Sequence, residues 1–135
     1  MKRSAQLTPV FLAGFFALAA LICAVAGASL LDPEGPLSPM WRIKPDEYRQ
    51  MLALGPFAGI GFLTLSTVMA AASVGTARRQ RWGWRLGCAI FAVNGLADAA
   101  RIPFGAVTEG MIGLVAASAI LWWLARPAVR AEFAR

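Results

Sequence analysis

The sequence has no histidine and only two cysteines among its 135 residues. Without histidine the chain cannot form a Ser-His-Asp or Cys-His triad, and it lacks the usual ligands of zinc, copper and haem. Cys23 and Cys88 lie in different apolar segments, on opposite sides of the expected membrane midplane, so we expect two free thiols. There is also no phosphate-binding loop and no paired nucleophile and base. The sequence therefore predicts no metal, no cofactor and no evident enzymatic activity.

Acidic residues are scarce as well, since seven Asp and Glu stand against thirteen Lys and Arg, for a net charge of +6. A basic balance of this kind can indicate nucleic-acid binding. Here the basic residues occur in short clusters between apolar runs, and membrane topology explains that pattern without a nucleic acid. The composition is 59% hydrophobic, above the ~45–50% typical of soluble domains. A globule of this size cannot hide that much apolar surface, so lipid is the expected solvent.

Four apolar segments approach the ~20-residue length that crosses a bilayer as a helix. The third is the weakest, because only residues 86–97 within it are uncharged. We predict an all-α membrane protein, an antiparallel four-helix transmembrane bundle forming one domain over residues 1–135. The expected transmembrane helices cover residues 8–31, 51–77, 82–102 and 105–125, with an outer loop at 32–50, a cytoplasmic loop at 78–81 and a cytoplasmic tail at 126–135.

The first segment permits a second interpretation. Its basic start, apolar run and small residues near Ala26 and Ala28 resemble a secretory signal with an A-x-A cleavage site. Signal peptides have apolar regions of about 7–15 residues, and this run is longer. We therefore expect a retained helix, with cleavage as the alternative.

The distribution of Lys and Arg predicts the orientation. Basic residues gather at both termini and in the 78–85 segment, whereas the 32–50 loop mixes basic and acidic residues. The positive-inside rule then places both termini in the cytoplasm, which an even number of spans satisfies. Arginine outnumbers lysine and alanine is abundant, as in GC-rich bacterial genomes, so we expect the bacterial inner membrane. The basic residues that this orientation places on the cytoplasmic side are Lys2, Arg3, Arg78, Arg79, Arg81, Arg85, Arg126, Arg130 and Arg135.

The basic 78–85 segment has two interpretations. The simpler one makes it a determinant of topology, with Trp82 and Trp84 as interfacial anchors. In the alternative, its arginines contact anionic lipid headgroups or an acidic partner. These candidate contacts are Arg78, Arg79, Arg81 and Arg85.

Small residues recur at helical spacing in two of the predicted spans. Helices in lipid associate by close packing and hydrogen bonds, so such stripes indicate helix contacts. We expect packing within the chain, with a homo-oligomer as the alternative. The stripes consist of Ala106, Gly110, Gly113 and Ala117 in the fourth span, and of Ser66, Ala70 and Ser73 in the second.

A polar cluster interrupts the apolar C-terminal half. Asn94, Asp98 and Arg101 recur at i, i+4 and i+7, and Glu109 follows the turn expected at Pro103. Charges inside hydrocarbon are costly, so these groups should face protein or water. The cluster has three interpretations: a structural clasp, a site for an ion, proton or small polar headgroup, or acid–base catalysis by Asp98 or Glu109. In the first, Asn94 hydrogen-bonds across helices, with Thr64 and Thr67 as candidate partners.

Two functional hypotheses follow. The first is a non-enzymatic accessory or structural subunit of a membrane assembly, whose partners are lipids and other membrane subunits or a second copy. The alternative is a binder or transporter of a small solute, ion, proton or lipid that uses Asn94, Asp98, Arg101 and Glu109.

Overall fold

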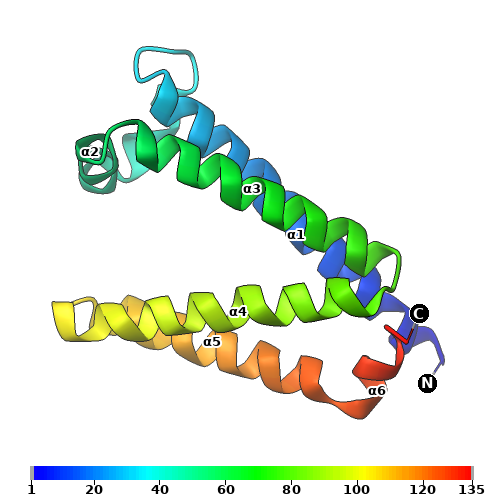
Figure 1. Cartoon of the computed structure of the whole chain (residues 1–135). Helices are drawn as coiled ribbons and strands as arrows, with labels where there is room; N and C mark the ends of the chain where they lie inside the picture. The colour runs from blue at the N-terminus through cyan, green and yellow to red at the C-terminus, as the bar shows by residue number, and fades with distance from the viewer. Residues whose placement is uncertain (1, 135) are drawn as a thin grey trace. The chain divides into compact units, whose positions relative to one another are not determined.

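Every regular element in residues 2–134, the part of the chain that the computed structural model describes, is a helix. Side chains are described from residue 7, so the basic side chains of Lys2 and Arg3, and all of Arg135, lie outside the described residues. The elements, drawn in Figure 1, are α1 (Lys2–Leu31), η1 (Ser38–Ile43), α2 (Pro45–Ala53), α3 (Pro56–Ala77), α4 (Arg81–Arg101), η2 (Ile102–Phe104), α5 (Val107–Ala125) and α6 (Pro127–Ala131).

Within the described part of the chain, three helices are long and apolar enough to cross a membrane: Leu7–Leu31 within α1, then α3 and α5. Only 17% of the most apolar window of α5 is buried, so most of that surface needs lipid or a partner protein to cover it. The predicted third span, α4, is 21 residues long but is not among these helices, because Arg85, Asn94 and Asp98 lower its hydropathy.

The chain forms two compact units, and the first consists of Gly14–Ser73. Within it α1 and α3 approach closely at two glycines. A Cβ atom added at Gly59 would lie 2.7 Å from Leu31 Cγ and 3.1 Å from the carbonyl oxygen of Gly27. The Ser66 hydroxyl donates a 2.7 Å hydrogen bond to the carbonyl oxygen of Ala20, which links the two helices in the way membrane helices associate.

The expected 51–77 helix is interrupted near its start. α2 ends at Ala53, and Gly55 adopts a φ of +64° before Pro56 opens α3. The physical reason is that left-handed backbone suits glycine, and that proline is favoured in the first turn of a helix, where its missing N–H costs nothing. In the preceding connection the Trp41 indole donates to Ser29 Oγ at 2.8 Å.

The second unit holds α4, α5 and α6. α4 and α5 form an antiparallel pair joined by η2, where Pro103 lies in the first turn and Gly105 takes a φ of +97°. The turn expected at Pro103 is therefore present. The two helices pack closely at Gly95, where an added Cβ would lie 3.0 Å from the Cβ of Ala117.

The tail is folded, which the sequence interpretation did not anticipate. Pro127 opens α6, and Val129 and Phe133 are buried, the latter with 1% of its surface exposed. Val129 lies in α6, and Phe133 lies in the turn directly after this helix. The basic end of the α4–α5 pair therefore includes a folded tail with buried side chains.

Candidate functional site

Asp98 lies in the α4–α5 interface, opposite Gly110 and Gly113 of α5. A Cβ at Gly113 would collide with the Asp98 carboxylate, and one at Gly110 would lie 2.6 Å from the Asp98 carbonyl oxygen. The Asp98 side chain is 28% exposed. The carboxylate thus fills a space that the absence of a side chain at Gly113 leaves open.

Arg101 forms an ion pair with Asp98, with 3.9 Å between Arg101 Nη1 and Asp98 Oδ1. The two residues belong to one helix at i, i+3 spacing, and the Arg101 side chain is 56% exposed. Glu109 is exposed in the first turn of α5, where the helix dipole favours an acidic group. Glu109 has no ion pair among the described side chains, so the expected three-residue clasp contains only two members in the structure.

Asn94 is exposed in the middle of α4, and no hydrogen bond of its side chain occurs within residues 7–134. Its candidate partners use their hydroxyls within their own helix. Thr64 donates to the carbonyl oxygen of Ile60 at 2.9 Å, and Thr67 donates to that of Leu63 at 3.1 Å. Such bonds back to residue i−4 are common for Ser and Thr in membrane helices.

The small-residue stripes lie in different environments. In the first stripe, Gly110 and Ala117 of α5 are buried, whereas Gly113 and Ala106, the residue directly before α5, are half-buried. On α3, Ser66 and Ser73 are half-buried and Ala70 is exposed, and the buried positions between Ser66 and Ser73 are Met69 and Ala72. Close helix contact therefore follows the α5 stripe from Gly110 to Ala117, but only part of the α3 stripe.

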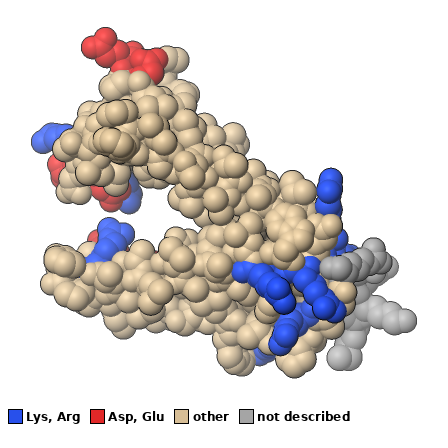
Figure 2. Space-filling model, viewed as in Figure 1, with Lys and Arg blue, Asp and Glu red and all other residues tan. Residues whose placement is uncertain are grey.

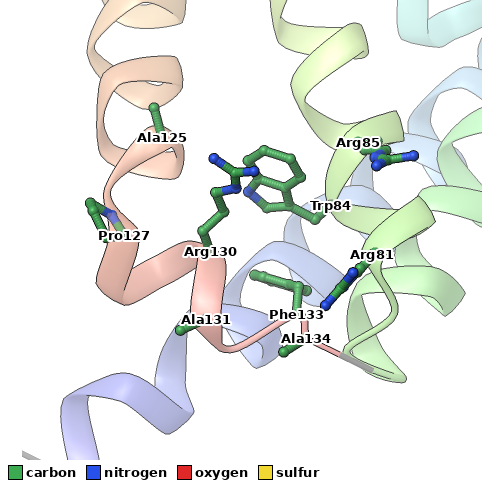
Figure 3. A pocket seen from close by; sticks show the side chains of 9 residues that line it. All are labelled: Arg81, Trp84, Arg85, Ala125, Pro127, Arg130, Ala131, Phe133 and Ala134. Carbon is green, nitrogen blue, oxygen red and sulfur yellow. The ribbon is translucent and has the colours of Figure 1, made fainter.

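A pocket opens at the opposite end of the α4–α5 pair from Asp98, between the start of α4 and the folded tail. Its volume is about 440 Å³, and its walls include Arg81, Trp84, Arg85, Arg130 and Phe133 (Figure 3). Figure 2 shows Lys and Arg side chains gathered at this end of the pair, next to surface that carries no charge. The pocket lining contains no Asp or Glu.

Trp84 organises one side of this pocket. Its indole N–H donates to the carbonyl oxygen of Leu124 at 3.2 Å, a group near the C-terminus of α5 that lacks a helical partner of its own. The Arg130 guanidinium lies 5.5 Å from the Trp84 ring centroid, within cation–π range. Nearby, the Arg126 guanidinium lies 4.0 Å from the ring centroid of Trp122.

The four arginines predicted as lipid contacts divide between the pocket and its surroundings. Arg81 and Arg85 line the pocket, but Arg78 and Arg79 do not. Arg79, in the left-handed region with a φ of 55°, acts electrostatically on Glu132. Burial raises the pKa of Glu132, and the positive charge of Arg79 partly opposes that rise. One oxygen of this carboxylate, Oε2, is shielded from solvent and has no hydrogen-bond partner in the described chain.

Sequence reasoning missed Arg130 and Phe133 as parts of a site. The available signal was local: Pro127 is typical of a first helical turn, and Val129 and Phe133 repeat at helical spacing. Comparison with protein family models, with curated proteins and with solved structures found no match to this chain.

Proposed function

We propose that this chain is a non-enzymatic accessory subunit of a membrane assembly in the bacterial inner membrane, with both termini in the cytoplasm. In this proposal α4 is a fourth transmembrane helix. Its 21 residues correspond to about 31 Å, enough to cross the hydrocarbon core. Because α4 packs antiparallel along α5, which is apolar enough to span, the two helices would share the same depth in the bilayer.

The observation that carries the proposal is the packing of Asp98. Its carboxylate lies against Gly113 and beside Arg101 within the α4–α5 pair. A carboxylate used in this way stabilises a helix contact and satisfies a charge that hydrocarbon would penalise. The cluster then needs no substrate to explain it, which favours a structural role.

Asn94 offers a contact for another subunit. It is exposed mid-helix between Val93 and Leu96, which are 64% and 71% exposed. An asparagine amide within hydrocarbon gains from a hydrogen bond to a neighbouring helix. We therefore expect the partner helix to cover Asn94 and the apolar residues beside it.

Site-specific photo-crosslinking in the native membrane tests this proposal. A photoreactive residue at position 93 should give one discrete adduct with a second polypeptide, and Asn94→Ala should weaken it. Position 115, which is also an exposed valine, is the matched control on α5. Adducts with lipid alone at both positions, together with a lone monomer in mild detergent, would exclude the subunit role.

The alternative function is binding or transport of a small solute, ion, proton or lipid. The exposed charges of Arg101 and Glu109 near Asp98 favour it, because they leave polar groups accessible at that end of the pair. Proton flux into proteoliposomes should then fall in Asp98→Asn and in Glu109→Gln. Equal flux in wild type and in both variants would remove this alternative.

A further inference from the structure

We propose that the pocket between α4 and α6 binds the phosphate group of an anionic ligand, with Arg81 and Arg130 as its charged contacts. The expected source of that phosphate is an anionic phospholipid headgroup, and free phosphate is the other source of the same chemistry. Only the lipid source rests on the proposed membrane topology; the phosphate chemistry does not.

Within the described residues, the charged side chains of the pocket have no acidic partner. Arg81, Arg85 and Arg130 all line it, and none of them forms an ion pair with a carboxylate in residues 7–134. Three guanidinium groups that share one cavity repel one another, and a bound anion relieves that repulsion. Guanidinium groups also present paired N–H donors that match the oxygens of a phosphate.

The geometry leaves the Arg130 donors available. Its guanidinium lies 5.5 Å from the centroid of the Trp84 ring, and none of its N–H groups donates a hydrogen bond within the described residues. Trp84 is itself held by its hydrogen bond to Leu124. Figure 3 shows Arg130 against the Trp84 ring and Arg81 on the Phe133 side of the same pocket, so the two arginines approach a ligand from different helices.

The surroundings fit a lipid headgroup. Trp82 and Trp122 are exposed near the same end of the α4–α5 pair, with Arg126 over the second ring. Tryptophan and arginine at a helix end are typical of the membrane–water interface, where phospholipid phosphates lie. The apolar faces of Trp84 and Phe133 would then border the glycerol region of the lipid.

Native mass spectrometry of the full chain in detergent tests this inference. The probes are phosphatidylglycerol, zwitterionic phosphatidylcholine and inorganic phosphate, each titrated separately. The pocket variant is Arg81→Gln with Arg130→Gln. The matched control is Arg78→Gln with Arg126→Gln, which removes two charges from the same end of the molecule but none from the pocket.

Wild type should retain phosphatidylglycerol roughly tenfold more tightly than phosphatidylcholine, because each arginine near an anionic headgroup contributes to binding. The pocket variant should lose roughly that factor, and the control variant should stay within about twofold of wild type. Tight binding of inorganic phosphate, lost in the pocket variant and without a preference for phosphatidylglycerol, would support the site and assign it to free phosphate. Equal retention by the pocket and control variants would overturn the proposal.

Two further variants separate binding from folding. Arg81→Gln alone removes an exposed side chain, and Arg130→Lys keeps a positive charge but loses the planar fork. Both should weaken phosphate binding while far-UV circular dichroism stays at the wild-type value. Unchanged affinity in both folded variants would also overturn the proposal. Phosphate binding in detergent depends neither on the orientation of the protein in the membrane nor on a partner subunit. A failure to detect this binding would therefore leave the proposed subunit function unaffected.

Discussion

The Asp98 carboxylate occupies the space beside Gly113 that a side chain on α5 would need. This relationship joins the two features that stood out in the sequence, a charged residue in an apolar helix and a stripe of small residues in the next. It means that the small residues accommodate the polar one, since helix pairs in lipid gain stability from close approach and from satisfied polar groups.

The first prediction is that Asp98 and Gly113 are energetically coupled. Gly113→Ala should destabilise the protein, because its Cβ would collide with the carboxylate, and Asp98→Ala should relieve much of that penalty. The double-mutant cycle should give a coupling of about 0.5–3 kcal/mol, as for residues in contact. Unfolding by SDS in mixed micelles measures each corner, and additive effects would contradict the proposed packing.

The second prediction concerns Gly110, which faces the backbone of α4 as well as a side chain. A Cβ there would lie 2.6 Å from the carbonyl oxygen of Asp98 and 2.7 Å from Ile102 Cγ1. Gly110→Ala should therefore force α4 and α5 apart and cost about 1–3 kcal/mol, the range for overpacking. Gly61→Ala is the control, since a Cβ at that helical position meets nothing within 4 Å. Equal stability of the two variants in the same SDS titration would argue against a close contact at Gly110.

The third prediction separates two kinds of hydroxyl on α3. Ser66 donates across to Ala20 of α1, whereas Thr67 donates to Leu63 of its own helix. Ser66→Ala should cost about 0.6–1.7 kcal/mol, the range measured for hydrogen bonds between membrane helices. Thr67→Val keeps the shape of the side chain and should change the unfolding free energy by less. A larger loss in Thr67→Val would contradict the assignment of Ser66 as the interhelical contact.

Long apolar runs made most of the helices predictable, because the length that spans a bilayer is fixed by geometry and does not depend on partners. The predicted first, second and fourth spans correspond to helices that are long and apolar enough to cross a bilayer, and the predicted third span corresponds to α4. The break at Gly55 and Pro56 was harder to foresee, since the apolar composition continues through it.

The polar cluster could be found from the sequence, but its geometry could not. The i, i+4, i+7 spacing groups Asn94 with Asp98 and Arg101 on one side of α4. The side that meets α5 runs instead through Gly95, Asp98 and Ile102. Asn94 precedes Gly95 by one residue, which turns its side chain by about 100° from that line. A helical wheel shows which residues share one face of a helix, but it does not show which face contacts the neighbouring helix.

The fourth prediction concerns topology. In a Cys23→Ala, Cys88→Ala background, cysteines replace Glu34 in the expected outer loop, and Arg78 and Ala128 at the expected cytoplasmic end. A membrane-impermeant maleimide should label Glu34→Cys in spheroplasts, and the other two only after permeabilisation, because basic segments remain in the cytoplasm. Labelling of positions 78 and 128 from opposite sides would show that α4 does not span.

The last prediction follows from Glu132. Burial raises its pKa in the folded tail, so the folded state binds this proton more tightly than the unfolded state does. The stabilisation is then fully present below the ordinary pKa of a glutamate, near pH 4 to 5, and is lost as the pH rises through the elevated folded-state value. Docking of the tail should therefore strengthen on mild acidification.

Glu132→Gln should remove this pH dependence. A neutral amide avoids the cost of burying a charged carboxylate, one oxygen of which has no hydrogen-bond partner in the described chain. Hydrogen exchange of residues 127–134, compared between wild type and variant at each pH, measures the docking directly. At neutral pH the variant should exchange more slowly than wild type, and the two should converge near pH 4. Glu109→Gln, far from the tail in sequence and exposed on α5, is the control and should match wild type throughout. Faster exchange in Glu132→Gln at neutral pH would mean that the attraction between Arg79 and Glu132 outweighs the burial of the carboxylate.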